Sequence, residues 1–127
     1  MGMYTEICCK IRFDENLDDT IVNTLKYMVG GSGEEPDNLP NHDLFKTDRW
    51  HSMLRSSSYY HIPKSNMDFF YDDISKSWYL IGRSDLKNYH DEIELFFDWV
   101  KYYCEYSDEF IGYSLYEESN EPSIFKS

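Results

Sequence analysis

Hydrophobic and polar residues alternate through residues 3–13, close to the start of the chain. One set contains Ile7, Cys9, Ile11 and Phe13, and the other contains Glu6, Cys8, Lys10 and Arg12. Successive side chains of a strand point to opposite faces, so this alternation is typical of a half-buried strand. We therefore expect a strand whose apolar face lies against a core.

Two later segments carry apolar residues at helical spacing instead. We expect the first helix to be capped by Asn16 and to end at the glycines at 30 and 31. We expect the second to be capped by Asn88, with Asp91 at its third position. Its apolar stripe comprises Ile93, Phe96, Phe97, Val100 and Cys104. Recurrence at three, four and seven residues predicts amphipathic helices in both places.

The remaining segments predict strands and loops. Expected strands cover residues 51–61, 67–72, 76–84 and 110–116, with a loop over 30–43, a helical turn over 44–50 and a short tail from 122. The second and third of these strands form a hairpin, since Asp72 and Asp73 favour its turn. An antiparallel sheet of four or five strands with both helices on one face satisfies every apolar stripe. We predict a single α+β domain, residues 1–127, elaborated from a ferredoxin-like sandwich.

Charge is distributed unevenly along the 127 residues. The formal net charge is −12, and 18% of the residues are aromatic. Residues 1–43 and 90–127 hold nineteen acidic and five basic residues, whereas residues 44–89 hold five acidic and seven basic ones. The aromatic content excludes a disordered acidic tail. We expect no direct binding to nucleic acid or to a membrane, because both require cations that neutralise phosphate.

No motif in the chain predicts chemistry. The three cysteines have no disulfide framework and no signal peptide precedes them, so a reducing, cytoplasmic location is expected. The four histidines and three cysteines lack zinc-site spacing, and the glycine-rich stretches match no phosphate-binding motif. Asp72 and Asp73 suit a turn better than a metal-dependent nuclease site. We therefore expect no metal, no cofactor and no enzymatic activity.

Cations, serines and tyrosines mix in residues 46–61. Arginine suits phosphate, serine hydroxyls add hydrogen bonds, and tyrosine stacks on a base. One hypothesis is a pocket that sequesters a nucleotide signal such as a cyclic oligonucleotide or an ADP-ribose derivative, at an oligomer interface or within one chain. Its candidate residues are Arg55, Ser57, Tyr59, His61, Arg83 and Lys87. The alternative is that these arginines pair with the abundant carboxylates of the chain.

Acidic residues gather on the second helix and in the region near the C-terminus. The candidate partner-binding residues are Asp91, Glu94, Asp98, Glu117 and Glu118. Carboxylates at such spacing imitate a phosphate backbone, and they would compete for a basic groove on another protein. The alternative is a solvated face that keeps the protein soluble.

Five segments are distinctive when they are taken together. They are LFKTDRW, SSSYY, YDDISKSWYL, SDLKNYHDEIELFFDW and YEESNEPSIF. Over nearly the whole chain they resemble a family of small acidic proteins encoded by bacteriophages and prophages. The resemblance implies an accessory protein of the bacterial host cytoplasm and, by association, a stoichiometric inhibitor of an antiviral defence system. It implies no catalytic residue.

Overall fold

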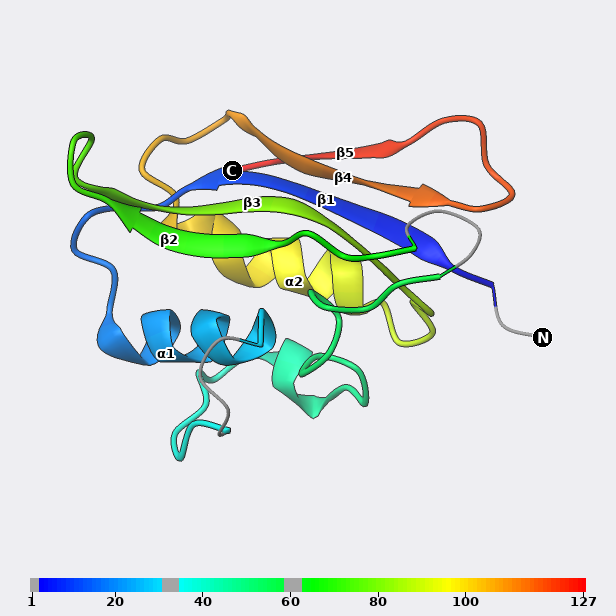
Figure 1. The fold of residues 1–127 in the computed structure, drawn as a ribbon, viewed down its shortest axis with the longest axis horizontal. Coiled ribbons are helices and arrows are strands. Elements are labelled where there is room, and N and C mark those ends of the chain that lie inside the picture. Colours follow the sequence, from blue (N-terminus) through cyan, green and yellow to red (C-terminus); the bar gives the residue numbers. More distant parts are fainter. Residues whose placement is uncertain (1–2, 31–34, 59–62) are drawn as a thin grey trace.

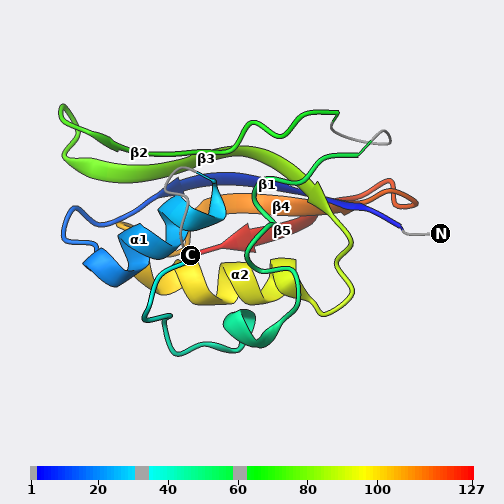
Figure 2. The same cartoon turned by 60° about the horizontal axis from the view of Figure 1, so that its bottom comes forward.

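Five strands and two α-helices form in the part of the chain that this computed structural model describes, residues 3–30, 35–58 and 63–127. They are β1 (Thr5–Arg12), α1 (Asp19–Met28), β2 (Asp68–Asp72), β3 (Ser77–Leu86), α2 (Glu92–Val100), β4 (Phe110–Tyr116) and β5 (Ser123–Lys126), with 3-10 turns η1 (Asp43–Lys46) and η2 (Lys101–Tyr103). Both helices lie on one face of the sheet, and no described helix covers the other face (Figures 1 and 2). The predicted α+β class is confirmed.

The strands follow the order β2-β3-β1-β4-β5, with β1 at the centre. Every neighbouring pair is antiparallel. In a ferredoxin-like sandwich the strand order β2-β3-β1-β4 is likewise antiparallel, because each split βαβ unit holds an antiparallel strand between its two parallel strands. The predicted likeness therefore includes the order and the directions of β1 to β4, and β5 extends the sheet beside β4.

β1 buries its apolar face as its alternation predicts. Ile7, Cys9 and Ile11 are at most 1% exposed and face the helices. The register pairs Cys8 with Arg83 and Lys10 with Ile81 across the two central strands. Residues paired across a sheet share a face, so these side chains lie on the face that the helices leave open.

The core lies between the sheet and the two helices. Its fully buried aliphatic and aromatic side chains include Leu25, Met28, Leu44, Met53, Leu54, Leu80, Ile93 and Phe96. Each contributes about 1.5–3 kcal/mol when it leaves water. The segment after η1 supplies Met53 and Leu54, which close the core on the side of the helices.

The start of α1 differs from the prediction. Asp18 caps the helix, and its carboxylate accepts a hydrogen bond from the Thr20 amide at 2.9 Å. Asn16 instead donates its amide to Asp14. Starting the helix at Asp19 leaves Leu17 in the linker, where it is 9% exposed in the core. Burial of Leu17 thus decides where the helix begins.

The start of α2 also differs from the prediction, in which Asn88 was the cap residue and Asp91 the third residue of the helix. Asp91 occupies the cap position in a left-handed conformation with φ 59°, and its side chain makes no capping bond. Asn88 Oδ1 accepts from the Ile93 amide at 2.9 Å, so it caps the helix from the preceding turn. Fully buried Glu92 accepts from the His90 amide at 3.0 Å.

The strand predicted over residues 51–61 is wrong for its described part, 51–58. This part forms turns and then follows the edge of β3, where the Asp85 amide donates to the Ser56 carbonyl at 3.2 Å. Met53 and Leu54 are both buried, so the alternating pattern does not correspond to two faces. The end of this predicted strand, residues 59–61, lies outside the described residues.

The expected tail is an edge strand. β5 pairs with β4, and the Phe125 ring stacks on Phe97 of α2 with ring centroids 4.2 Å apart. The strand is only four residues long, too short for a clear alternation. Its position depends on the contact between Phe125 and α2.

Candidate functional site

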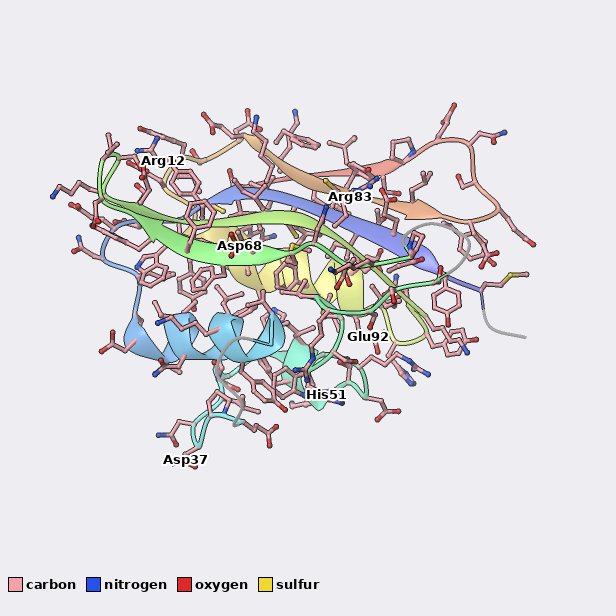
Figure 3. All side chains as sticks on the ribbon, viewed as in Figure 1. Arg12, Asp37, His51, Asp68, Arg83 and Glu92 are labelled. Atoms are coloured by element: carbon pink, nitrogen blue, oxygen red, sulfur yellow. The ribbon has the colours of Figure 1, made fainter. Side chains whose placement is uncertain are left out.

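The open face of the sheet carries charged residues among exposed apolar ones. Phe70, Ile81 and Phe110 are 38–43% exposed. Arg12 and Arg83 lie on the side away from the helices, whereas Glu92 lies on the helix side (Figure 3). An open sheet face of this kind is a natural place for a ligand or partner.

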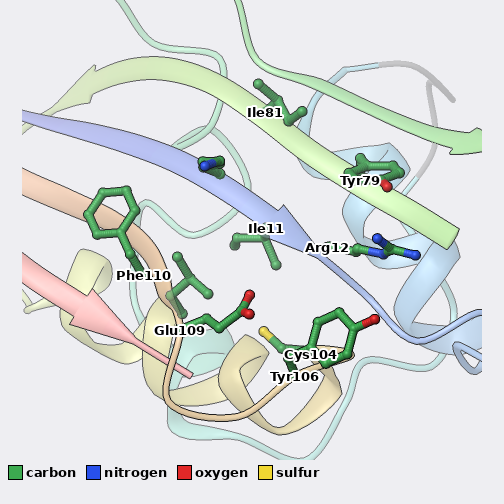
Figure 4. Close-up of a pocket in the computed structure, with 10 residues that line it drawn as sticks. Ile11, Arg12, Tyr79, Ile81, Cys104, Tyr106, Glu109 and Phe110 are labelled. Carbon is green, nitrogen blue, oxygen red and sulfur yellow. The ribbon is translucent and has the colours of Figure 1, made fainter. Parts of the chain in front are cut away.

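One groove on this face surrounds Arg12; we call it the sheet groove. It measures about 350 Å3, and its lining includes Lys10, Arg12, Tyr79, Ile81, Cys104, Tyr106, Glu109 and Phe110 (Figure 4). Arg12 forms an ion pair with Glu105. Its guanidinium carbon also lies 5.8 Å from the Tyr79 ring centroid and 5.7 Å from that of Tyr106.

The chemistry of the sheet groove does not favour an anion. Glu105 neutralises Arg12, and Glu109 balances Lys10, so the lining has no excess positive charge. Burial, assisted by the charge of Glu109, raises the pKa of Cys104 to about 11. The thiol is therefore neutral at physiological pH and is a poor nucleophile.

A second polar cluster lies farther along the open face. Glu6 is 6% exposed and accepts a hydrogen bond from the Tyr113 hydroxyl, while Arg83 Nη1 lies 3.7 Å from its carboxylate. Burial and the bond to Glu6 raise the pKa of Tyr113 to about 12. The neighbouring Asp85 is fully buried and accepts from the Ser58 hydroxyl. These contacts give the carboxylates of Glu6 and Asp85 hydrogen-bond partners, which buried polar groups normally have.

The residues proposed for nucleotide binding are dispersed. Arg55 lies over the Tyr27 ring at 5.5 Å, on the helix side, whereas Arg83 pairs with Glu6 on the open face. Lys87 lies 5.7 Å from the Tyr4 ring centroid, and Ser57 is exposed. The remaining two residues of that set, Tyr59 and His61, lie outside the described residues.

Three of the acidic candidates lie at the start of α2 and along it. Glu94 and Asp98 are exposed and four residues apart, so they share one stripe of the helix, and the exposed Asp91 precedes them at the cap position. Asp98 already has partners, because His42 Nε2 and Lys101 Nζ each approach its carboxylate at 3.0 Å. The hydrogen bonds from His42 and then Lys101 hold the pKa of Asp98 below its ordinary value. Asp98 therefore stabilises the fold more than it presents a free charge.

The other two candidates lie where β4 turns into β5. Glu117 accepts a hydrogen bond from the Tyr4 amide, and Glu118 is exposed. This turn and the start of α2 lie at the same end of the molecule (Figure 1).

A second groove lies at this end; we call it the end groove. It measures about 430 Å3 and is lined by Met3, Thr5, Asn88, Tyr89, Glu94, Ser114, Tyr116, Ser119, Glu121 and Ser123. Glu94 comes from α2 and Glu121 from the β4–β5 turn. The groove thus brings together the two acidic segments. The sequence marks Glu121 as part of the acidic region near the C-terminus, but the pattern along the chain does not show that it lies beside Glu94.

Within residues 3–30, 35–58 and 63–127, no three histidine, cysteine or acidic side chains are grouped so that they could hold a metal ion. In the same residues, no helix has both the length and the apolar character needed to cross a bilayer. No protein-family model, curated protein or solved structure matches this chain.

Proposed function

We propose that this protein is a non-enzymatic accessory protein that binds a basic, nucleic-acid-handling protein and inhibits it stoichiometrically. The observation that supports this function best is the end groove, where Glu94 and Glu121 line one cavity. Acidic segments that are distant in the sequence meet there, so their charges act on the same partner surface. Charge complementarity of this kind speeds association and excludes acidic competitors.

The partner is basic because the protein imitates nucleic acid. Exposed Asp91 and Glu94 on α2 and exposed Glu118 near the turn supply the imitation of a phosphate backbone. The resemblance to small acidic phage proteins supports a bacterial antiviral defence protein as the target. Such a target carries cationic surfaces that normally contact phosphate.

The test is loss of defence in bacteria. We expect expression of the protein to abolish phage resistance in a strain that carries the matching defence system, and inhibition of the purified target to saturate at one equivalent. The variant D91N/E94Q/E118Q should weaken inhibition at least tenfold and reduce its salt dependence, because fewer charges steer the encounter. The matched control is E15Q/E35Q/D73N, which neutralises three exposed acids outside the end groove.

Two outcomes would contradict the proposal. One is equal inhibition by D91N/E94Q/E118Q and the unmodified protein. The other is a rise in melting temperature with a cyclic oligonucleotide or an ADP-ribose derivative, which would favour a nucleotide-sequestering protein. A ligand at 100 times its dissociation constant adds about 2.7 kcal/mol, so such binding would be readily detected.

A further inference from the structure

The end groove offers hydrogen-bond acceptors and negative charge, but no cation. No described residue of its lining is a lysine, arginine or histidine. Glu94 Oε1 accepts from Asn88 Nδ2 at 2.7 Å, which leaves its second oxygen without a described partner. The carboxylate of Glu121 forms no ion pair with a described residue. Glu92 and Glu94 in the first turn of α2 offset the positive end of the helix dipole.

Two buried hydroxyls in the groove provide a second and independent observation. Thr5 and Ser114 line it and are 8% and 6% exposed. They lie on the helix side of the sheet, since Ser114 pairs with the core residue Ile7, and Thr5 pairs with Leu86. Neither hydroxyl forms a hydrogen bond with a described residue. Because both residues line the groove and make no hydrogen bond with a described residue, their hydroxyls are available to an occupant.

Aromatic rings form part of the same lining. Tyr89 is 56% exposed and Tyr116 is 39% exposed, and both belong to the groove. A planar cation stacks favourably on such rings, and the gain increases when the site excludes water. The lining therefore combines carboxylates, hydroxyl acceptors and aromatic surfaces around one cavity.

We propose that the end groove binds an arginine side chain of the partner protein. Guanidinium is planar and has five donors, which match two carboxylates and several hydroxyls, and it also stacks on tyrosine. Lysine has a compact ammonium with three donors, so it would use fewer of these groups. This inference rests on the proposed function, because it names the chemical group of the basic partner that enters the site.

The probes are acetyl-arginine-methylamide, the corresponding lysine compound and the uncharged citrulline compound. Each is titrated into the isotope-labelled full-length protein, and amide chemical shifts are followed by NMR. We expect saturable shifts at Thr5, Glu94 and Ser114 with the arginine compound, binding about fivefold weaker with lysine, and none with citrulline.

Variants test the contacts one by one. E94Q/E121Q should weaken arginine binding at least tenfold, because each change removes a charged acceptor. T5V and S114A remove one hydroxyl each and should weaken binding about threefold. D98N is the matched control, since Asp98 lies on the same helix but does not line the groove. Spectra of the free variants show whether each one is folded.

Separate results would overturn this inference and the proposed function. The arginine site would be refuted if the shifts were confined to Asp91 and Asp98, or if the lysine and arginine compounds bound equally. The proposed binding of a basic partner through acidic residues would be unaffected by either result. If the arginine compound bound saturably in the groove but the protein inhibited no defence protein, the proposed function would be refuted and the arginine site would remain supported. No saturable shift with any of the compounds would overturn the inference.

Discussion

At the scale of single residues, a short polar network surrounds the buried carboxylate of Glu6. Glu6 is almost fully buried, and the Tyr113 hydroxyl and Arg83 compensate its charge. Removing one partner from such a group leaves a desolvated charge, which costs more than the bond itself contributes. Tyr113 therefore affects stability from the open face of the sheet, where it pairs with Cys8.

The variant Y113F should lower the free energy of unfolding by about 1–3 kcal/mol at pH 7. Burial and the bond to Glu6 raise the pKa of Tyr113 in the folded protein to about 12, above the unfolded value of about 10. A raised folded pKa gives stability that is complete below pH 10 and is lost as the pH rises through 12. Urea unfolding between pH 7 and 11 measures both effects.

The control for this experiment is Y106F. Tyr106 is exposed, and its hydroxyl makes no hydrogen bond with a described residue. Cys104, whose pKa is about 11, titrates in an overlapping range, and it does so equally in both variants. Equal stability of Y113F and Y106F at pH 7 would show that Glu6 does not depend on the hydroxyl.

At the scale of elements, the local pattern predicts some segments of the chain, and tertiary packing decides the structure of the others. β1, α2 and β4 form where periodicity predicts them, because each buries apolar residues at the spacing of its own element. The β2–β3 hairpin also forms where it was predicted, with its turn after Asp72. The segment 51–58 does not, since its apparent alternation includes two adjacent core residues. β5 was missed because a four-residue strand has too little pattern, and its position follows from pairing with β4 and from the stacking of Phe125 on Phe97.

The position of β5 should depend on Phe125. We expect F125A to lower the free energy of unfolding by about 3 kcal/mol and to speed hydrogen exchange of the β5 amides, because the ring stacks on Phe97. The neighbouring I124A is the matched control. Ile124 is 54% exposed, so its loss should change stability by less than about 0.5 kcal/mol. Equal exchange in both variants would contradict this account of the edge strand.

At the scale of the whole molecule, the net charge of −12 opposes the compact state. Salt screens repulsion between surface carboxylates within about 10 Å at 0.1 M. The described ion pairs are few, so repulsion outweighs attraction at low salt.

We therefore expect the melting temperature to rise by roughly 4 °C, or about 1 kcal/mol, between 10 mM and 200 mM salt. D91N/E118Q should be more stable than the unmodified protein at low salt and less sensitive to salt. The control K64Q changes the net charge in the opposite direction, because it removes an exposed cation, and it should make the melting temperature depend more strongly on salt. A melting temperature that falls with salt in all three proteins would show that ion pairs dominate. Calorimetry at fixed pH supplies the measurement.

The sequence alone determined the fold class, the faces of β1 and β3, the helices and the acidity of the two ends of the chain. These properties follow from local periodicity and from charge, which do not depend on distant contacts. Only the tertiary structure decided that Glu94 and Glu121 share a groove and that Thr5 and Ser114 are buried in it without hydroxyl partners. It also decided the close packing at Gly112, where a Cβ would lie 2.2 Å from the Cys8 carbonyl oxygen. Such features depend on which strands become neighbours, and strand pairing is fixed by burial across the whole sheet rather than by neighbouring residues.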